Sequence, residues 1–381
     1  MPAELKDFFL DLQKREIIAD HANLENFFQL KPNEKVIYWG VDCTNDSLHI
    51  GSLFTILQLV RFAQKGFKML LILGVATSKI GDPSDKDKER PLLEVNQIDG
   101  FQEKIKEQLN SLLIKPKKDS PLFLNFSPLE KFYSNVFTNG ELLKNVNKVL
   151  EIPDEGNNKE KWEKYLQYIW PLKDSSKFQI LNNQDWLEKI NFIDFLRKTG
   201  KNLTVAYLSA KETIKKRIDT GISYLEFSYP LIQAYDFYYL YENYNCHGQL
   251  GGSDQWGNLT TGLKLIHNYH PQNKCFALTF NLLTDKEGKK ISKSSAGKTI
   301  WLSPEKTSFP EFYDFLRNLP DEKALKFLSQ FTFLTEEQVK KIDQLNNPRK
   351  LRIPQRILIE LLFYLLYGER GMEWLKKESA K

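Results

Sequence analysis

Residues 36–75 read VIYWGVDCTNDSLHIGSLFTILQLVRFAQKGFKMLLILGV and contain two short apolar runs separated by a longer segment. The runs at 36–41 and 69–75 predict two buried strands. The segment that begins at Ser47 continues without a breaker to Gly66, which predicts a helix between the strands. Strand, helix and strand in this order form a βαβ unit, so we expect a parallel sheet.

The rest of the sequence predicts further helices, one more strand, an insertion and a loop. From residue 304 onward only helical patterns occur. Residues 116–176 break the rhythm with Lys, Asn, Pro and aromatic residues, and we interpret them as a partly helical insertion at the edge of the core. Helices are predicted at 4–18, 184–199, 209–219 and 225–244, a strand at 275–280 and a mobile polar loop at 284–299.

Composition limits the function classes. The chain has 381 residues, with 54 Lys and Arg against 49 Asp and Glu, so the net charge of +5 permits a polyanionic partner without requiring one. Its 3 cysteines are far apart and lack the spacing of a zinc site, so we expect reduced thiols, no protein-bound metal and a cytoplasmic location. No apolar run is long enough to span a bilayer, and the N-terminus does not read as a targeting signal.

The first strand carries polar residues on one face. Tyr38, Gly40 and Asp42 alternate with apolar neighbours, and ligands of open α/β sheets bind beyond the carboxyl ends of strands. Gly40 allows a ligand to approach the backbone. The alternative is a core tyrosine whose hydroxyl is satisfied, followed by a turn aspartate, and this strand alone favours that alternative by roughly two to one.

The turn into the following helix, CTNDSLHIGS at 43–52, has the features of a phosphate-binding helix start. Free N–H groups attract anions there, Thr44 and His49 add donors, and Gly51 lets a flat group pack against the helix. A helix cap with an incidental histidine is the alternative.

The loop at 284–299 contains Lys290 and Lys293, whose ammonium groups are three residues apart and suited to a leaving diphosphate. Most lysine pairs of this kind are simply solvated.

A polar stripe runs along the predicted helix at 225–244. Tyr229, Gln233 and Asp236 occur at i, i+4 and i+7 on an otherwise aromatic segment, so a lined pocket is favoured over a solvent face by roughly two to one. The glycine-rich stretch GGSDQWGN at 251–258 places Asp254, suited to ribose hydroxyls, beside Gln255. Its alternative is an ordinary turn.

These motifs occur together in a specific order: HIGS at 49–52, YPLIQAYD at 229–236, GGSDQWGN at 251–258 and KISKS at 290–294. In that order they resemble bacterial-type tyrosyl-tRNA synthetases, which belong to the class I synthetases with HIGH and KMSKS signatures. The similarity covers 36 to about 115 and about 178 to 335. It implies a Rossmann-like α/β catalytic domain over 1–300 and an α-helical anticodon-side domain over 301–381, without the S4-like domain of bacterial members.

The resemblance also implies a role for each site residue. Tyr38 and Asp236 would bind the phenol of tyrosine, and Asp82, Tyr229 and Gln233 its ammonium group, with Gln255 near its carboxylate. The residues implied in ATP binding are Gly40, Asp42, Thr44, His49, Gly51, Ser52, Gly252 and Asp254. Those implied in holding the phosphates are Lys86, Arg90, Lys290, Lys293 and Ser294.

The implied reaction joins tyrosine to a tyrosine transfer RNA with Mg²⁺-bound ATP as substrate, in a homodimer. A pocket that pairs with the phenol rejects phenylalanine, and tyrosyl-tRNA synthetases are themselves the known example of that rule. Ser52 departs from the final histidine of HIGH, which puts the ATP contacts there in question. Three alternatives stay open: a tryptophanyl-tRNA synthetase, a small-molecule nucleotidyltransferase, and a non-catalytic RNA-binding relative.

Overall fold

The computed structural model describes residues 2–84, 92–114, 140–152, 164, 167–171, 175–219, 221–283, 298–345 and 352–378. The chain divides into two compact units. The first consists of Met1–Leu48, Arg61–Asn110 and Ser176–Lys290, and the second of His49–Val60, Ser111–Ser175 and Ile291–Lys381. The domain ranges 1–300 and 301–381 remain a prediction.

A six-stranded sheet forms the centre of the first unit, in the order β1-β6-β5-β2-β3-β4. The strands are β1 Ile18–Ala22, β2 Val36–Asp42, β3 Lys68–Gly74, β4 Phe178–Asn182, β5 Gly248–Gly252 and β6 Phe276–Phe280. All neighbouring pairs are parallel except β1 with β6. The predicted parallel sheet is confirmed, as are the strands at 36–41, 69–75 and 275–280.

Three strands were not predicted, and each lacks the usual signal. The edge strand β1 is polar (IADHA), β5 contains three glycines (GQLGG), and β4 follows the insertion. Glycine is unfavourable in an isolated strand. In β5 it is required by packing, because a Cβ on Gly248 would lie 2.3 Å from the Phe276 ring.

Helices surround the sheet and form most of the second unit. Their bounds are α1 Pro2–Lys14, α2 Leu24–Phe28, α3 Ile50–Gln64, α4 Val75–Ser78, α5 Val95–Leu109, α7 Gly140–Val149, α9 Gln184–Leu187, α10 Phe192–Lys198, α11 Val205–Ser209, α12 Glu212–Ile218, α13 Tyr224–Tyr244, α14 Trp256–Tyr269, α15 Phe309–Arg317, α16 Asp321–Phe331, α17 Glu336–Leu345 and α18 Ile353–Glu378. The first helix ends earlier than predicted because Glu16 adopts a left-handed φ of 52°. The segment at 184–199 contains two helices instead of one.

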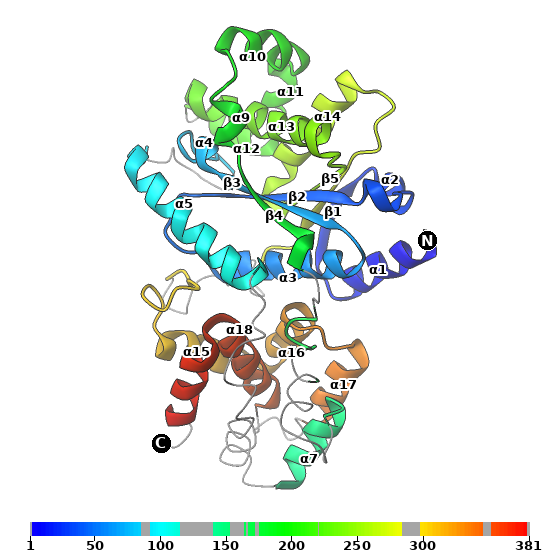
Figure 1. Ribbon diagram of the computed structural model, residues 1–381, viewed down its shortest axis with the longest axis vertical. Coiled ribbons are helices and arrows are strands. Elements are labelled where there is room, and N and C mark those ends of the chain that lie inside the picture. Colours follow the sequence, from blue (N-terminus) through cyan, green and yellow to red (C-terminus); the bar gives the residue numbers. More distant parts are fainter. Residues whose placement is uncertain are drawn as a thin grey trace. The chain divides into compact units, whose positions relative to one another are not determined.

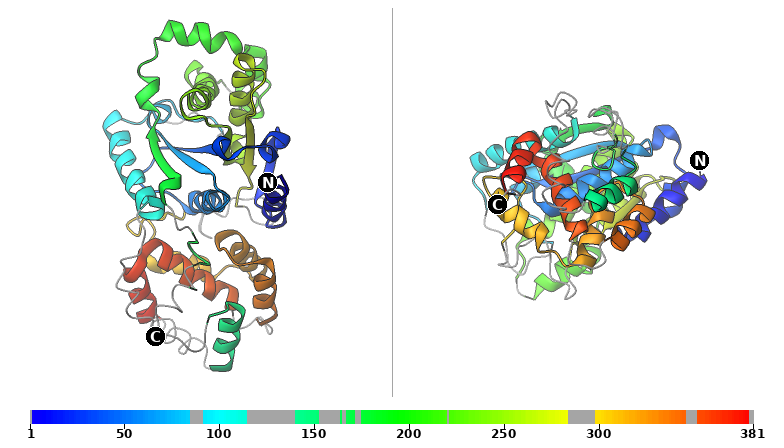
Figure 2. Two further views of the ribbon diagram at one scale, coloured as in Figure 1. Left: turned by 45° about the vertical axis from the view of Figure 1, so that its right-hand side comes forward. Right: turned by 90° about the horizontal axis from the view of Figure 1, so that it is seen from below.

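The two faces of the sheet bury different helices (Figure 1). On one face, Tyr38 and Leu70 pack against Phe237 of α13 and Leu259 of α14. Figure 2 shows these two helices together on the same side of the blue strands β2 and β3. The other face is covered by an aromatic cluster of the first unit: Phe8, Phe9, Phe27, Phe62, Phe67, Phe276 and Phe280. Strand alternation therefore directs the side chain of Tyr38 toward α13.

The start of α13 is held from outside the helix. Pro230 has no N–H, so the carbonyl of Glu226 loses its ordinary helical partner one turn earlier. Ser223 caps the helix, and the buried guanidinium of Arg217 in α12 approaches the Glu226 carboxylate at 2.9 Å. The ion pair fixes the turn that precedes the polar stripe of α13.

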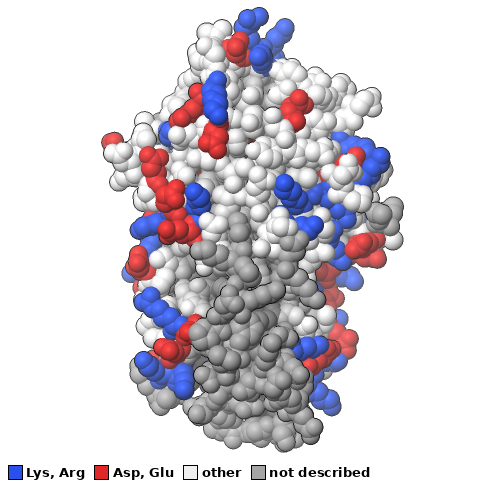
Figure 3. Space-filling model, in the orientation of Figure 1, with Lys and Arg blue, Asp and Glu red and all other residues white. Residues whose placement is uncertain are grey.

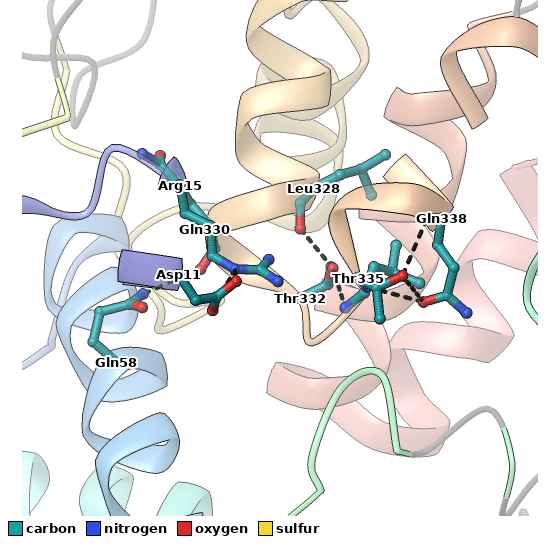
Figure 4. A network of polar contacts seen from close by, with 9 residues as sticks. Asp11, Arg15, Gln58, Leu328, Gln330, Thr332, Thr335 and Gln338 are labelled. Carbon is teal, nitrogen blue, oxygen red and sulfur yellow. Dashed lines mark hydrogen bonds and ion pairs between the residues drawn. The ribbon is translucent and has the colours of Figure 1, made fainter. Parts of the chain in front are cut away.

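The second unit is mainly helical (Figure 2). In it, α7 packs against α17, whereas both α15 and α16 pack against α18. Thr335 and Gln338 form a reciprocal cap at the start of α17, with hydrogen bonds of 3.2 and 2.9 Å (Figure 4). Gln338 also donates to the hydroxyl of Tyr168 at 3.0 Å. The described part of the insertion is thus attached to α17 by buried polar contacts.

Candidate active site

Polar side chains gather where four parallel strands of the first unit end. Asp42 ends β2, Thr77 lies in α4 directly after β3, Asn183 follows β4, and Gln255 ends the short 3₁₀ helix after β5. The chain leaves β2 toward β3, whereas β5 lies on the other side of β2. Such a switch point in strand order is where open α/β sheets bind ligands.

One end of this site is buried and centres on Asp236. Its carboxylate is buried and accepts hydrogen bonds from Asn183 Nδ2 at 3.1 Å and Trp186 Nε1 at 2.7 Å. Burial raises the pKa of Asp236 to about 7, although both hydrogen bonds act to lower it. Asp236 therefore keeps its proton to a higher pH than an exposed aspartate does.

Tyr38 completes this end. Its ring packs on Phe237 with centroids 5.3 Å apart, and its hydroxyl has no hydrogen-bond partner among the described residues. Burial and the Asp236 carboxylate raise the pKa of the Tyr38 phenol well above its usual range. An unpaired buried hydroxyl is unfavourable. A ligand that carries its own hydroxyl would satisfy this group.

The other end of the site is a ring of mutually bonded polar groups. Gln255 Nε2 donates to Asp82 Oδ2 at 2.6 Å, and Asn258 Nδ2 contacts Gln255 Oε1 at 3.1 Å and Gln233 Oε1 at 3.0 Å. The backbone N–H of Ser84 donates to Asp82 Oδ1 at 2.9 Å. These acceptor oxygens converge in a way that suits a cationic ligand group.

Asp42 lies beside this ring and has two identified donors. The hydroxyl of Tyr229 donates to Asp42 Oδ2 at 3.0 Å, and the hydroxyl of Thr77 donates to Oδ1 at 2.7 Å. Burial, followed by the Asp42 carboxylate, raises the pKa of Tyr229 well above its usual range. Tyr229 is therefore neutral, and its oxygen keeps a lone pair for a further donor.

The remaining predicted residues of the first unit flank the strand ends. Gly40 is exposed, and a Cβ there would meet no atom closer than 3.9 Å, so packing within the described residues does not require glycine. Gly252 differs, because a Cβ would lie 2.4 Å from the carboxylate of Asp254. Thr44 is partly exposed two residues beyond Asp42.

His49, Gly51 and Ser52 belong to the second unit, at the start of α3. The backbone N–H of Ser52 donates to His49 Nδ1 at 3.1 Å, so Nδ1 is the acceptor and a neutral ring carries its proton on Nε2. Gly51 allows this geometry, since a Cβ would lie 2.9 Å from the His49 ring.

Five predicted residues lie outside the described part of the chain: Lys86, Arg90, Lys290, Lys293 and Ser294. Conversely, four residues of the site were not predicted: Thr77, Asn183, Trp186 and Asn258. Only Asn258 had a usable signal, since it closes the GGSDQWGN stretch. The others follow strands β3 and β4, and their partners are distant in sequence: Asp42 of β2 for Thr77, and Asp236 of α13 for Asn183 and Trp186.

Two further observations concern the described residues alone. No helix among them is long and apolar enough to cross a membrane. Within the same ranges, no group of three or more His, Cys, Asp or Glu side chains is arranged to hold a metal ion.

Comparison with protein families gives one match over most of the chain. The family described as tRNA synthetases class I (W and Y) matches residues 31–362. The tyrosine–tRNA ligase of Geobacillus stearothermophilus is 37% identical over 368 residues, which cover 96% of this chain and 74% of that protein. The tyrosine–tRNA ligase of Mesomycoplasma hyopneumoniae strain 7448 is 37% identical over 380 residues, or 98% and 75% of the two chains.

Solved structures show the same fold. A C-terminally truncated mitochondrial tyrosyl-tRNA synthetase of Aspergillus nidulans superimposes with a TM-score of 0.70 at 23% identity, covering 100% of this chain and 96% of that one. A tyrosyl-tRNA synthetase of Archaeoglobus fulgidus, complexed with L-tyrosine, gives a TM-score of 0.57 at 13% identity and covers 97% and 99%.

Proposed function

Because this chain belongs to the class I tRNA synthetases of the tryptophan and tyrosine type, we infer that it is a tyrosine–tRNA ligase. It activates L-tyrosine with ATP to tyrosyl-adenylate and diphosphate, and then transfers tyrosine to the 3′ end of tyrosine transfer RNA. The observation that carries the choice of amino acid is the buried pair of Tyr38 and Asp236, which presents an unpaired hydroxyl beside a carboxylate.

The phenol of tyrosine can both donate a hydrogen bond to this pair and accept one from it. A phenol O–H can donate to the Asp236 carboxylate, while its oxygen accepts the hydrogen of Tyr38. An indole N–H can only donate, so tryptophan would leave the Tyr38 hydroxyl buried without a partner. This difference favours tyrosine over the other amino acid of the family.

The ammonium group of tyrosine is assigned to the polar ring. It carries three N–H donors. Asp82 and the amide oxygen of Gln233 in the ring can accept two of them, and the remaining lone pair of the Tyr229 hydroxyl can accept the third. Gln255, held by Asp82 at 2.6 Å, would lie near the substrate carboxylate. The pocket thus binds tyrosine by both polar ends.

The chemical step needs no general base. The tyrosine carboxylate is a nucleophile at neutral pH and attacks the α-phosphate of ATP, expelling diphosphate. The protein contributes positioning and stabilisation of the negative charge that develops on the phosphates. In the second step, the terminal ribose hydroxyl of transfer RNA attacks the adenylate carbonyl and releases AMP.

ATP enters with Mg²⁺ as a substrate, and its contacts are part of this proposal. In the first unit, Gly40, Asp42, Thr44, Gly252 and Asp254 are assigned to the nucleotide. His49, Gly51 and Ser52 keep the nucleotide role implied by the HIGS motif. Lys86, Arg90, Lys290, Lys293 and Ser294 are assigned to the phosphates on the same ground.

The proposed assembly is a cytoplasmic homodimer that binds transfer RNA. Phe192, Ile193, Val205 and Tyr224 on α10, α11 and α13 are 58–69% exposed, and exposed apolar side chains that form one contiguous patch are typical of interfaces. Figure 3 shows Lys and Arg mixed with Asp and Glu over the described part of one face. Charge on that face therefore does not mark an RNA footprint by itself.

The test is tyrosine-dependent exchange of labelled diphosphate into ATP, followed by charging of tyrosine transfer RNA. We expect exchange with tyrosine and none with tryptophan at the same concentration. Exchange driven by tryptophan would assign the chain to the other amino acid of the family. Binding of transfer RNA without any exchange would point to the non-catalytic alternative.

A further inference from the structure

A chain of hydrogen bonds connects the two carboxylates Asp236 and Asp42 within the first unit. Asn183 Nδ2 donates to Asp236 Oδ2 at 3.1 Å and to Thr77 Oγ1 at 3.2 Å. Thr77 Oγ1 in turn donates to Asp42 Oδ1 at 2.7 Å. Three hydrogen bonds thus span from the group assigned to the phenol to a group assigned to ATP.

The direction of every bond in this chain is determined. The backbone N–H of Ala76 donates to Asn183 Oδ1 at 2.9 Å, which identifies the amide oxygen and excludes a flipped side chain. Both N–H groups of Asn183 are then used. Thr77 has a single hydrogen, and since it accepts from Asn183, that hydrogen goes to Asp42. The hydroxyl cannot serve either end independently of the other.

Glycine at position 74 makes the Asp42 contact possible. A Cβ on Gly74 would lie 2.4 Å from Asp42 Oδ1 and 2.5 Å from Thr77 Oγ1. The φ of Gly74 is −78°, so its backbone conformation does not itself require glycine. The space beside the hydrogen bond is the reason for glycine at this position.

We propose that Thr77 is a positioning residue that couples tyrosine binding to ATP binding through this hydrogen-bond chain. The inference rests on the proposed function, because that function places a tyrosine phenol at Asp236 and a nucleotide at Asp42. A ligand that binds at one end polarises and strengthens the bonds of Asn183 and Thr77, so a ligand at the other end meets a stronger chain. Each substrate then binds more tightly when the other is present, by the same factor in both directions.

The experiment measures the dissociation constant of L-tyrosine by calorimetry, with and without saturating Mg²⁺-bound α,β-methylene-ATP, which cannot be converted to the adenylate. For the unmodified protein, we expect tyrosine to bind at least about fivefold more tightly with the analogue, the lower end of typical coupling. Thr77→Val removes the hydroxyl at nearly constant volume, and the ratio should fall toward 1. Thr77→Ser keeps the hydroxyl and should keep the ratio.

A matched control separates coupling from stability. Thr261 in α14 is also fully buried, but its hydroxyl donates only within its own helix, to Gly257 O at 2.7 Å. Thr261→Val should leave the ratio unchanged. Thr77→Ala serves as a second removal variant if Thr77→Val does not fold, because it adds no methyl group.

Two results would overturn the inference: a ratio near 1 in the unmodified protein, or removal variants that weaken both ligands while their ratio stays the same. The second result is what a merely structural threonine would give. Failure of the proposed function looks different, since the unmodified protein would then show no tyrosine-dependent diphosphate exchange.

Discussion

The two ends of the proposed tyrosine pocket differ in how their buried polar groups are paired. At the phenol end, the hydroxyl of Tyr38 is buried without a described partner, and burial raises the pKa of Asp236 to about 7. At the ammonium end, Asp82, Gln233, Gln255 and Asn258 already bond to one another. One end is incomplete until the substrate arrives, and the other is ordered in advance.

The difference has consequences for binding and for stability. An ordered polar ring needs little rearrangement when an ammonium group replaces part of its network. The incompletely paired phenol end makes the free protein less stable, but any molecule that cannot pair with Tyr38 and Asp236 leaves buried polar groups unsatisfied. Affinity for an amino acid is thus assigned to the ring, and selection of its side chain to the phenol end.

The largest effect is expected at the ordered end. Asp82→Asn removes the carboxylate that would pair with the ammonium group, and it replaces an acceptor of Gln255 with a donor. Truncating one member of a buried charge pair costs about 2–5 kcal/mol, so kcat/KM for tyrosine in diphosphate exchange should fall roughly 30- to 4,000-fold. Asp343→Asn, which alters an exposed carboxylate of α17, is the control and should have no effect. If Asp82→Asn had the same kcat/KM as the unmodified protein, the polar ring would not be the binding site of the ammonium group.

A smaller loss is expected at the phenol end. Asp236→Asn weakens a hydrogen bond to a charged group, worth about 1.5–3 kcal/mol, so kcat/KM for tyrosine should fall roughly 10- to 150-fold. Phenylalanine gains nothing from that bond, so its kcat/KM should change little and the preference for tyrosine should narrow. Diphosphate exchange measured with tyrosine and with phenylalanine gives this preference for the variant and for the unmodified protein. A preference that stays as wide as before would show that Asp236 does not recognise the hydroxyl.

The pH dependence should separate the two ends. Because the pKa of Asp236 is raised to about 7, the carboxylate that we propose as acceptor of the phenol forms only as pH rises through that value. Tyrosine should therefore bind up to roughly tenfold more tightly at pH 8 than at pH 6. Calorimetric titrations at a series of pH values measure this change, and Asp236→Asn should abolish it. A flat profile in the unmodified protein would contradict the raised pKa.

The same pKa shift makes the free energy of unfolding change with pH in the opposite direction from tyrosine binding. The raised pKa means that the folded protein holds a proton on Asp236 that the unfolded chain has released between about pH 4 and pH 7. The contribution of Asp236 to stability therefore declines as pH rises over that range and is constant above it. Tyrosine binding and stability should thus respond to pH in opposite directions at this residue.

The smallest effect is expected from Tyr38→Phe, and its two consequences should differ in sign. Removing an unpaired buried hydroxyl should raise the free energy of unfolding of the free protein by about 1 kcal/mol. Losing the hydrogen bond to the phenol should weaken tyrosine binding by about 0.5–1.5 kcal/mol. Denaturant unfolding and calorimetry measure the two terms. A variant that is less stable without ligand would mean that the hydroxyl is already paired in the free protein.

The accuracy of the sequence predictions depended on whether a feature is local. Two kinds of feature were predictable because the spacing of residues along the chain reveals them: the strands at 36–41 and 69–75, and the stripe of Tyr229, Gln233 and Asp236. Strand β5 was missed because its glycines carry no strand signal of their own. Thr77 was missed because nothing in the order of residues shows that β3 brings it within 2.7 Å of Asp42.

The sequence by itself determined the parallel α/β core, the order of the motifs and which side-chain chemistries the chain has available, since these depend on residue type and spacing. Only the tertiary structure decided which groups meet. Strand order places the ends of β2, β3 and β4 side by side, and so joins Asp42, Thr77 and Asn183. Packing of α13 against the sheet then buries Asp236, which raises its pKa, and leaves the hydroxyl of Tyr38 without a described partner. Desolvation and pairing are properties of the packed interior, and no residue has them before the chain folds.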